Sequence, residues 1–215
     1  MTIKFIRGAF WLTMLFTVSC GPLFPSGGGE KDYFVLIDDE SAPKPLSRRW
    51  KYRILVRDAK GNRFISSHKI VFSDDPAKRG YYQLAQWVEP PTKQFTSLLL
   101  ERLERAKLFL TASRLASSAL ADLQLNSEIE EFYHDTSERP GKVRVRVSAE
   151  LIDLKKRLPL DKKEFSRILE VSDYSAEGAV TGFSEAINQI LNELVEWTNR
   201  GAERLSVEQA ADSFR

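Results

Sequence analysis

Cysteine and histidine are almost absent from this 215-residue sequence, which has one cysteine, Cys20, and two histidines, His68 and His134. A single thiol cannot form a disulfide within the chain, so the fold must be stabilised by its hydrophobic core. Both histidines are expected in polar loops, and neither has a partner at the spacing of zinc ligands. The sequence therefore predicts no metal site and no cofactor.

Phosphate-binding and nucleophile motifs are lacking as well. No P-loop and no G-x-S-x-G turn is present, so the chain is predicted to be neither an ATPase nor another enzyme. One alternative stays open, a hydrolase whose serine, histidine and aspartate meet only in space, with Asp75 or Asp135 beside a histidine. Changing His68 or His134 would then abolish an activity.

The sequence also lacks a strong net charge, because 32 lysines and arginines face 30 aspartates and glutamates. Lys4 and Arg7 fall in the first 19 residues, which contain no acid, so the remaining side chains are neutral overall (+2 − 2 = 0). A neutral chain without a dense basic run gives no indication of nucleic-acid binding. The short basic run 155–157 is expected to be a solvated turn.

The N-terminus has the pattern of a secretory signal peptide over residues 1–19. Lys4 and Arg7 are followed by the apolar run 9–16 and then by the small residue Ser19, and these three parts in this order define such a signal. The apolar run is shorter than the roughly 20 residues that a membrane-spanning helix needs. No other segment is apolar enough to cross a bilayer.

The last residues before the predicted cleavage point, Thr-Val-Ser at 17–19, together with Cys20 resemble the lipobox of bacterial lipoproteins, in which the cysteine is acylated. We therefore expect Cys20 to carry fatty acyl chains such as palmitate, and each buried methylene group would add about 0.8 kcal/mol of membrane affinity. Gly21 stands where an aspartate would retain a lipoprotein in the inner membrane, which favours the outer membrane. Two alternatives remain: a secreted protein in which Cys20 is incidental, and an uncleaved signal anchor.

Three further parts follow the signal peptide. Residues 20–31 are predicted to be a tether, since glycine and serine at 26–29 give a flexible chain. Residues 32–200 are long enough for one domain with its own core. Residues 201–215 are polar and are expected to fray.

Short runs of β-branched and aromatic residues predict several strands before the middle of the domain. These strands are expected at 32–38, 50–57, 64–72, 81–84 and 108–111. A helix is predicted over 92–107, where Pro91 suits the first turn and Phe95, Arg102 and Leu103 follow helical spacing.

The most regular alternation of apolar and polar residues occurs at 121–133 and 143–151, which predicts an antiparallel hairpin joined by the loop 134–141. Two glutamates would then face two arginines on the solvent side, where opposite charges contribute about 0.2–1 kcal/mol per pair. These residues are Glu128, Glu130, Arg144 and Arg146.

A further strand is expected at 162–172, followed by a long helix over 180–201 that Ser175 or Asp173 would cap and Gly201 would end. The order of strands, helix, strands and helix predicts an α+β fold. We expect a mixed, mostly antiparallel sheet with two amphipathic helices packed on it.

Three aromatic residues, Tyr81, Tyr82 and Trp87, precede the first helix. They are candidates for a hydrophobic ligand or partner surface, although side chains at such a junction more often fill the core. The acidic runs 38–40 and 74–75 lack the spacing and the glycine of a calcium loop, and are interpreted as solvated turns.

The order and spacing of these structural motifs identify a family. After the lipobox, the segments concerned are 32–36, 70–72, 81–90, 121–125, 131–132 and 143–151, then a closing helix with Ala186, Asn188 and Trp197. This pattern, which covers nearly all of the mature chain, resembles the ABC-type transport auxiliary lipoprotein component family. Within the family it is similar to the branch of paraquat-inducible intermembrane transport lipoproteins.

The resemblance implies a non-enzymatic lipoprotein on the periplasmic face of the outer membrane. The expected partners are a periplasmic mammalian-cell-entry-type protein with its ABC permease and ATPase, phospholipid as cargo, and further copies of the chain. The alternative is a lipid-anchored interaction module that regulates cell-wall synthesis or secretion. Such a module would bind wall-synthesis or secretion proteins without lipid.

Overall fold

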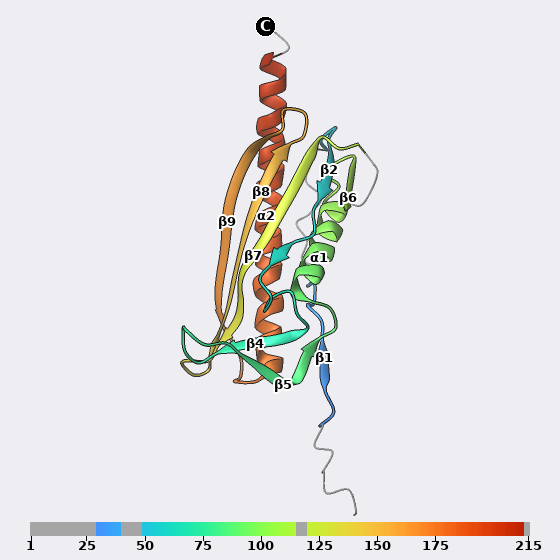
Figure 1. Cartoon of the computed structure of the whole chain (residues 1–215). Helices are drawn as coiled ribbons and strands as arrows, with labels where there is room; N and C mark the ends of the chain where they lie inside the picture. The colour runs from blue at the N-terminus through green and yellow to red at the C-terminus, as the bar shows by residue number, and fades with distance from the viewer. Residues whose placement is uncertain (1–28, 40–48, 115–119, 213–215) are drawn as a thin grey trace, which may run out of the picture.

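The computed structural model describes residues 29–39, 49–114 and 120–212 (Figure 1). These residues form one mixed sheet of nine strands and two helices, so the predicted α+β fold is confirmed. The elements in chain order are β1 (Asp32–Phe34), β2 (Arg53–Val56), β3 (Lys60–Gly61), β4 (Lys69–Ser73), β5 (Gly80–Trp87), α1 (Pro91–Ala106), β6 (Thr111–Arg114), β7 (Leu123–Asp135), β8 (Lys142–Asp153), β9 (Leu158–Glu170) and α2 (Ala176–Asp212).

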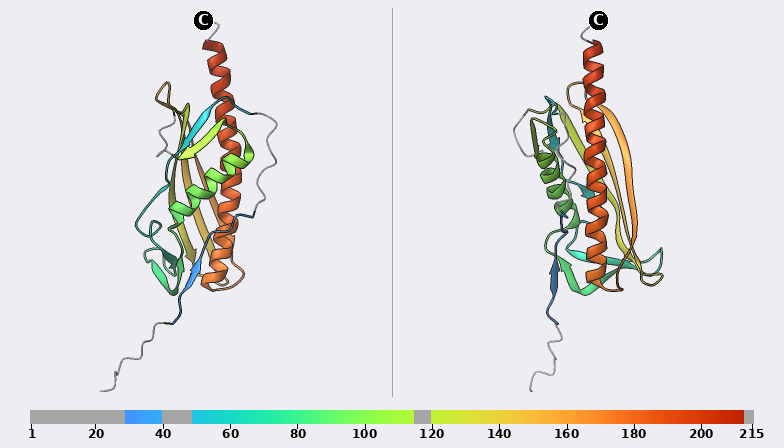
Figure 2. Two further views of the ribbon diagram at one scale, coloured as in Figure 1. Left: turned by 90° about the vertical axis from the view of Figure 1, so that its right-hand side faces the viewer. Right: turned by 180° about the vertical axis from the view of Figure 1, so that it is seen from behind.

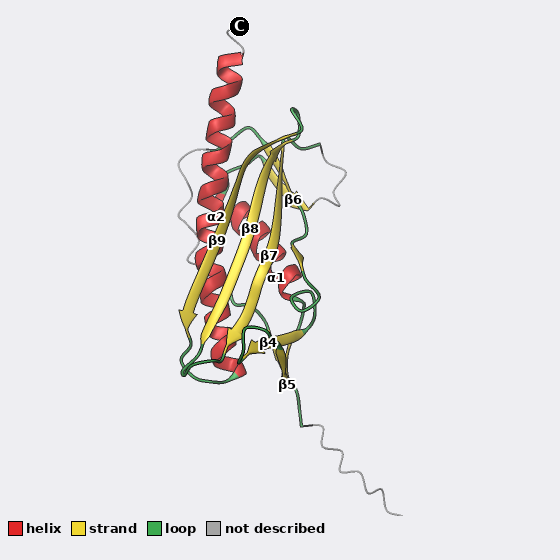
Figure 3. Ribbon diagram, turned by 60° about the vertical axis from the view of Figure 1, so that its left-hand side comes forward, coloured by secondary structure: helices red, strands yellow, loops and turns green. Residues whose placement is uncertain are grey.

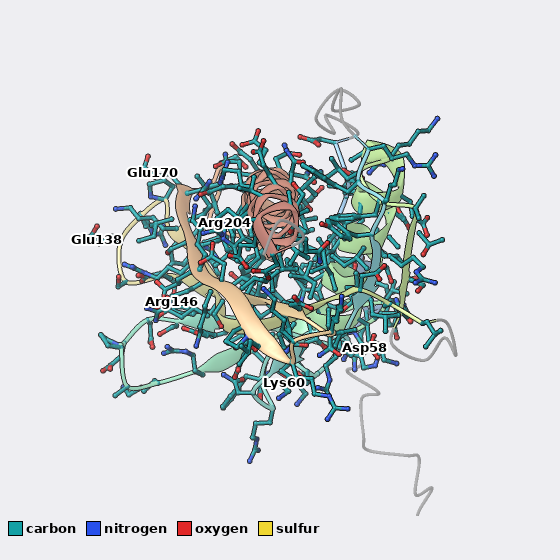
Figure 4. All side chains as sticks on the ribbon, turned by 90° about the horizontal axis from the view of Figure 1, so that it is seen from above. Asp58, Lys60, Glu138, Arg146, Glu170 and Arg204 are labelled. Carbon is teal, nitrogen blue, oxygen red and sulfur yellow. The ribbon has the colours of Figure 1, made fainter. Side chains whose placement is uncertain are left out.

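Three long antiparallel strands, β7, β8 and β9, form the regular part of the sheet, with β8 in the middle. Alternate residues of β8, such as Val143 and Val145, are buried, whereas Arg144 and Arg146 lie on the opposite face. Both helices cover the apolar face (Figure 3). In the view along α2, Arg204 extends from the helix itself, and Arg146 of β8 lies farther from the helix axis (Figure 4).

The other edge of β7 pairs with three short strands in succession, all parallel to it. β2 pairs at residues 123–125, β3 at 128–129 and β4 at 134–135. β6 continues the sheet from β2, and β5 and then β1 continue it from β4. The strands β4, β5 and β1 therefore gather at the end of β7 where the chain turns into β8. The long ladders are antiparallel, as expected.

Helix α1 begins with Pro91 in its first turn and ends at Lys107, which has the left-handed conformation of a C-cap (φ 51°). In α2 the amide of Gly178 donates to Ser175 Oγ (3.0 Å), so the predicted cap is confirmed. The predicted end of this helix at Gly201 is wrong, because α2 continues to Asp212. Gly201 serves close packing instead, since a Cβ at this position would collide with Leu151.

The strands predicted at 64–72 and 108–111 begin later in the structure than the sequence indicates. Residues 64–65 lie in a turn, and only Lys69–Ser73 forms β4. The segment 108–110 exchanges backbone hydrogen bonds with Trp50 and Tyr52, but the strand β6 begins only at Thr111. Leu108 and Phe109 are apolar because they are buried, and this apolar run predicts a strand although the two residues lie before β6.

An aromatic cluster joins the two parts of the sheet to α2. The rings of Phe132 in β7 and Phe183 in α2 stack with centroids 4.2 Å apart, and Trp87 of β5 lies 6.0 Å from both. Each of the three side chains is at least 96 % buried. Aromatic pairs in such geometries add about 0.5–1.5 kcal/mol beyond their buried area. This cluster therefore fixes β5, and with it β1, against the regular strands.

Candidate functional site

The N-terminal segment, residues 29–39, enters along the edge of the sheet and then crosses both helices (Figure 2). β1 pairs in parallel with β5. The backbone of the residues that follow β1 instead forms hydrogen bonds with side chains of the helices. The Leu36 amide donates to Gln94 Oε1 of α1 (2.7 Å), and the Ile37 amide donates to Ser184 Oγ of α2 (3.1 Å). The strand predicted here is therefore shortened to β1, because helices and not a strand flank the rest of the segment.

A buried arginine of α1 fastens the end of this segment. Arg102 Nη2 forms ion pairs with Asp38 Oδ1 (2.5 Å) and Asp39 Oδ1 (3.2 Å), and the Arg102 side chain is 0 % exposed. The same guanidinium donates to the backbone and side-chain oxygens of Asn188 (3.2 and 2.5 Å) and to Asn192 Oδ1 of α2. These five residues, here the Arg102 network, join α1, α2 and the N-terminal segment.

Arginine suits this position because its planar guanidinium is always charged and carries five donors. The interpretation of residues 38–40 as a solvated turn is wrong for Asp38, whose side chain is only 13 % exposed and is also paired with Arg105. The sequence did contain a signal, since Arg102 occupies an inward position of the helix beside Leu103. A charge at such a position indicates a buried partner but does not identify it.

The outward side of the N-terminal segment carries exposed apolar side chains. Tyr33, Val35 and Ile37 are 64 %, 49 % and 62 % exposed, and Leu84 and Val88 on and just after β5 are 50 % and 49 % exposed. The parallel register of β1 and β5 places Val35 beside Val88. We name these five residues the apolar strip. They are five of the eleven large apolar side chains exposed in the described residues, so this surface concentrates them.

The three aromatic residues predicted as a hydrophobic surface do not share one. Trp87 is 1 % exposed and belongs to the aromatic cluster, so it is a core residue. Tyr82 turns toward His134, whereas Tyr81 lies under Lys69 Nζ, which is 4.4 Å from its ring centroid. Tyr81 and Tyr82 are consecutive residues of β5, and successive side chains of a strand point to opposite faces of the sheet.

A β-bulge in β7 explains why His134 is buried rather than in a loop. The pairing of β7 with β8 shifts between Ile129 and Glu131, and an extra residue in a strand reverses which positions face inward beyond it. Phe132 and His134 therefore point into the core, whereas Tyr133, which fits the inward pattern of the sequence, is only half-buried. The loop prediction for His134 is wrong for this reason.

The two histidines have different surroundings. The His134 ring is 0 % exposed and its Nδ1 lies 2.7 Å from the Tyr82 hydroxyl. Burial lowers the pKa of His134 from 6.5, against the opposing charges of Asp135 and Asp173, and burial raises the pKa of Tyr82 to about 12. Both groups are therefore neutral at pH 7, and the pair acts as a structural hydrogen bond between β5 and β7. His68 lies in an exposed turn, as predicted.

The described residues offer grooves rather than a metal centre. Among residues 29–39, 49–114 and 120–212, no group of three or more histidines, cysteines or carboxylates could hold a metal ion. None of the helices in these ranges has the length and apolar character to cross a membrane. An open groove of about 450 Å³ lies near the end of α1, where Arg49, Glu104 and Lys107 alternate with apolar side chains. Its apolar lining residues are Leu103, Phe109, Leu110 and Ala112, so the groove has a mixed lining.

Two solved structures share this fold. A DUF330-family protein from Xanthomonas campestris superposes with a TM-score of 0.75 at 19 % sequence identity, covering 81 % of this chain and 98 % of the other. A second structure, of an uncharacterized protein, has a TM-score of 0.63 at 13 % identity and covers 79 % and 99 %. A comparison with curated proteins gave no match.

The family is shown by a match that spans residues 34–195, which is most of the chain. The chain belongs to the family of ABC-type transport auxiliary lipoprotein components, as the sequence pattern indicated. This is a family of lipoproteins that assist an ABC transport system, not of catalysts. The matched range begins at Phe34 within β1, so it includes the Arg102 network and most of the apolar strip.

Proposed function

We propose that the chain is an outer-membrane lipoprotein that serves an intermembrane lipid transport system from the periplasmic face. The observation that carries this proposal is the family match over residues 34–195, together with the lipobox-like sequence ending in Cys20 that lies upstream of it. In the proposed form, signal residues 1–19 are removed and Cys20 is acylated. Residues 20–31 tether the domain to the bilayer, and the chain has no catalytic activity of its own.

The structure supports an anchored role because it fixes the point where the tether joins the domain. The N-terminal segment is held by β5, by α1 and α2 side chains, and by the Arg102 network. Buried polar contacts would therefore hold the start of the domain in place against a force applied through the anchor. Helix α2 has 37 residues, which at 1.5 Å per residue gives about 55 Å. The C-terminal end of α2 lies at the end of the molecule opposite to β1 (Figure 1).

The proposed partners are those that the family resemblance implies. The far end of the domain would meet a periplasmic mammalian-cell-entry-type protein that works with an ABC permease and ATPase. Phospholipid would pass along that protein to or from the membrane that holds Cys20. Assembly of several copies around the partner is part of the proposal, as is a role for half-buried Tyr81 in a partner surface.

Affinity purification of the membrane-extracted protein tests this function, with partner identification and lipid analysis on the same sample. The expected result is recovery of a mammalian-cell-entry-type protein together with phospholipid. The Cys20→Ala protein is the matched control, because it keeps the domain and removes the only thiol. The variant should no longer be found in the membrane fraction and should no longer co-purify with lipid. The intact mass of the wild-type protein should include acyl chains.

Recovery of wall-synthesis or secretion proteins without lipid would sink the transport role and favour a regulatory interaction module. An unmodified Cys20 in the mature protein would sink the anchoring step. The two readouts are independent, since the mass reports on the anchor and the partners report on the pathway. Replacement of His68 or His134 by asparagine is expected to remove no enzymatic activity.

A further inference from the structure

The apolar strip lies where the chain would leave the membrane. Gly29, the first described residue, packs against Leu84 so closely that a Cβ would lie 3.3 Å from the Leu84 methyl carbons. Eight residues lie between Cys20 and Gly29, and the nine Cα–Cα steps of a fully extended chain between them span at most about 32 Å. A bilayer that holds acylated Cys20 is therefore always within this distance of the strip.

The strip is a fixed surface because the opposite side of the same backbone is buried. Leu36, Ala85 and Trp87 point inward from the two segments and are at most 6 % exposed. Alternation along extended chain then forces Tyr33, Val35 and Ile37 outward. The Arg102 network holds the segment just beyond Ile37. The side chains cannot turn away from solvent without breaking these inward contacts.

The composition of the strip suits the boundary between lipid headgroups and acyl chains. Valine, leucine and isoleucine side chains gain free energy there, and tyrosine is enriched at this depth because its ring is apolar and its hydroxyl is polar. The charged residues that flank the strip in the sequence are of both signs, with Lys31 and Asp32 before Tyr33 and Glu89 after Val88. Contact through such a surface does not require anionic lipid.

We propose that the apolar strip rests on the bilayer that holds Cys20, so that the domain stands on the membrane instead of swinging freely on its tether. This inference rests on the proposed lipidation. The covalent anchor makes the contact intramolecular, and a weak surface then suffices because the effective concentration of lipid is high. The strip thereby orients α2, whose C-terminus points away from the membrane toward a partner.

Tryptophan fluorescence with brominated lipid tests the contact. The probe is the acylated protein, purified from membranes and reconstituted in vesicles of phosphatidylcholine with or without bromine on the acyl chains. Tyr33→Trp is the reporter. Leu158→Trp is the matched control, because Leu158 is similarly exposed (59 % against 64 %) but lies at the opposite end of the sheet, next to Asp153 in the ladder. Trp50, Trp87 and Trp197 are buried in both proteins.

The expected result is that brominated lipid quenches Tyr33→Trp several-fold more strongly than Leu158→Trp. Adding Val35→Asn and Ile37→Asn to the reporter should remove most of this quenching without changing the circular dichroism spectrum. These substitutions replace apolar atoms that already face solvent, so the fold is retained.

Equal, weak quenching of both reporters in a protein whose mass confirms acylation would overturn the strip contact and leave the anchored transport role intact. A concentration-dependent blue shift of Tyr33→Trp without quenching would also overturn it, and would assign the strip to a second copy of the chain. A mass without acyl groups would overturn both proposals together.

Discussion

The regular strands and the N-terminal segment hold their backbones in different ways. Strand β8 has twelve paired residues on each side, with β7 and β9, whereas β1 has three pairs with β5 and relies beyond them on helix side chains and one buried arginine. In a long ladder the loss of one side chain leaves the backbone bonds in place. The N-terminal segment lacks such a series of backbone hydrogen bonds, so its position in the fold should depend on individual side chains.

The largest loss in the free energy of unfolding is expected from Arg102→Met, which removes the buried arginine that fastens the N-terminal segment. Methionine keeps much of the side-chain length but removes the buried guanidinium that pairs with Asp38 and donates to Asn188 and Asn192. Removing one partner of a buried ion pair costs about 3–5 kcal/mol, and chemical denaturation should show a loss of this size. Hydrogen exchange should rise in residues 31–39 and stay slow in β8.

The control for this change is Arg105→Met, since Arg105 pairs with the same Asp38 but is 37 % exposed. Exposed pairs contribute about 0–1 kcal/mol, so this variant should stay near the wild type. Similar small losses for both variants would contradict the role of the Arg102 network as the fastening of the segment.

The regular part of the fold was predictable because its pattern has one cause. Alternation in β8 and helical spacing in α1 both reflect a single buried face, and the structure confirms both elements within a few residues. The end of α2 was not predictable in this way, because Gly201 ends a helix by local rules but here faces Leu151. Local rules cannot show which glycine a neighbouring strand requires.

The candidate site was less predictable than the fold. A bulge after Ile129 reverses the inward positions of β7, and no sequence signal marks it, so the alternation predicts Tyr133 inward where the structure buries His134. The cross-strand charges were correct in part: Arg146 meets Glu130, whereas Arg144 pairs with Asp135. Residues 33–37 form an unbroken apolar run, so the sequence could not show which side of that run is covered.

A smaller effect is expected from pH, and it tests the junction between the two regions. Burial lowers the pKa of His134 below its ordinary 6.5, so the unfolded chain binds a proton more readily than the folded one. The contribution of neutral His134 to the free energy of unfolding is fully present above a pH of about 6.5 and is lost as the pH falls toward the lowered pKa. The free energy of unfolding should therefore fall between pH 7 and about 5.5, before most carboxylates titrate.

Replacing His134 by glutamine should flatten this slope, because the side chain no longer titrates. His68→Gln is the matched control, since His68 lies in an exposed turn, and its slope should equal that of the wild type. Hydrogen exchange at pH 5.5 should increase first in β4 and β5, which meet β7 at His134. A slope unchanged by His134→Gln would place the pH sensitivity elsewhere.

The smallest effect is expected on the outer face of the regular strands. Arg146 lies 3.5 Å from Glu130 and also pairs with Glu131, and all three side chains are about one-third exposed. Arg146→Gln should lower the free energy of unfolding by less than about 1 kcal/mol, and salt should reduce the difference further. A loss above roughly 2 kcal/mol would mean that charges across the hairpin, and not its ladders, hold the regular strands. The contrast with the N-terminal segment would then be one of degree, because both regions would depend on single arginines.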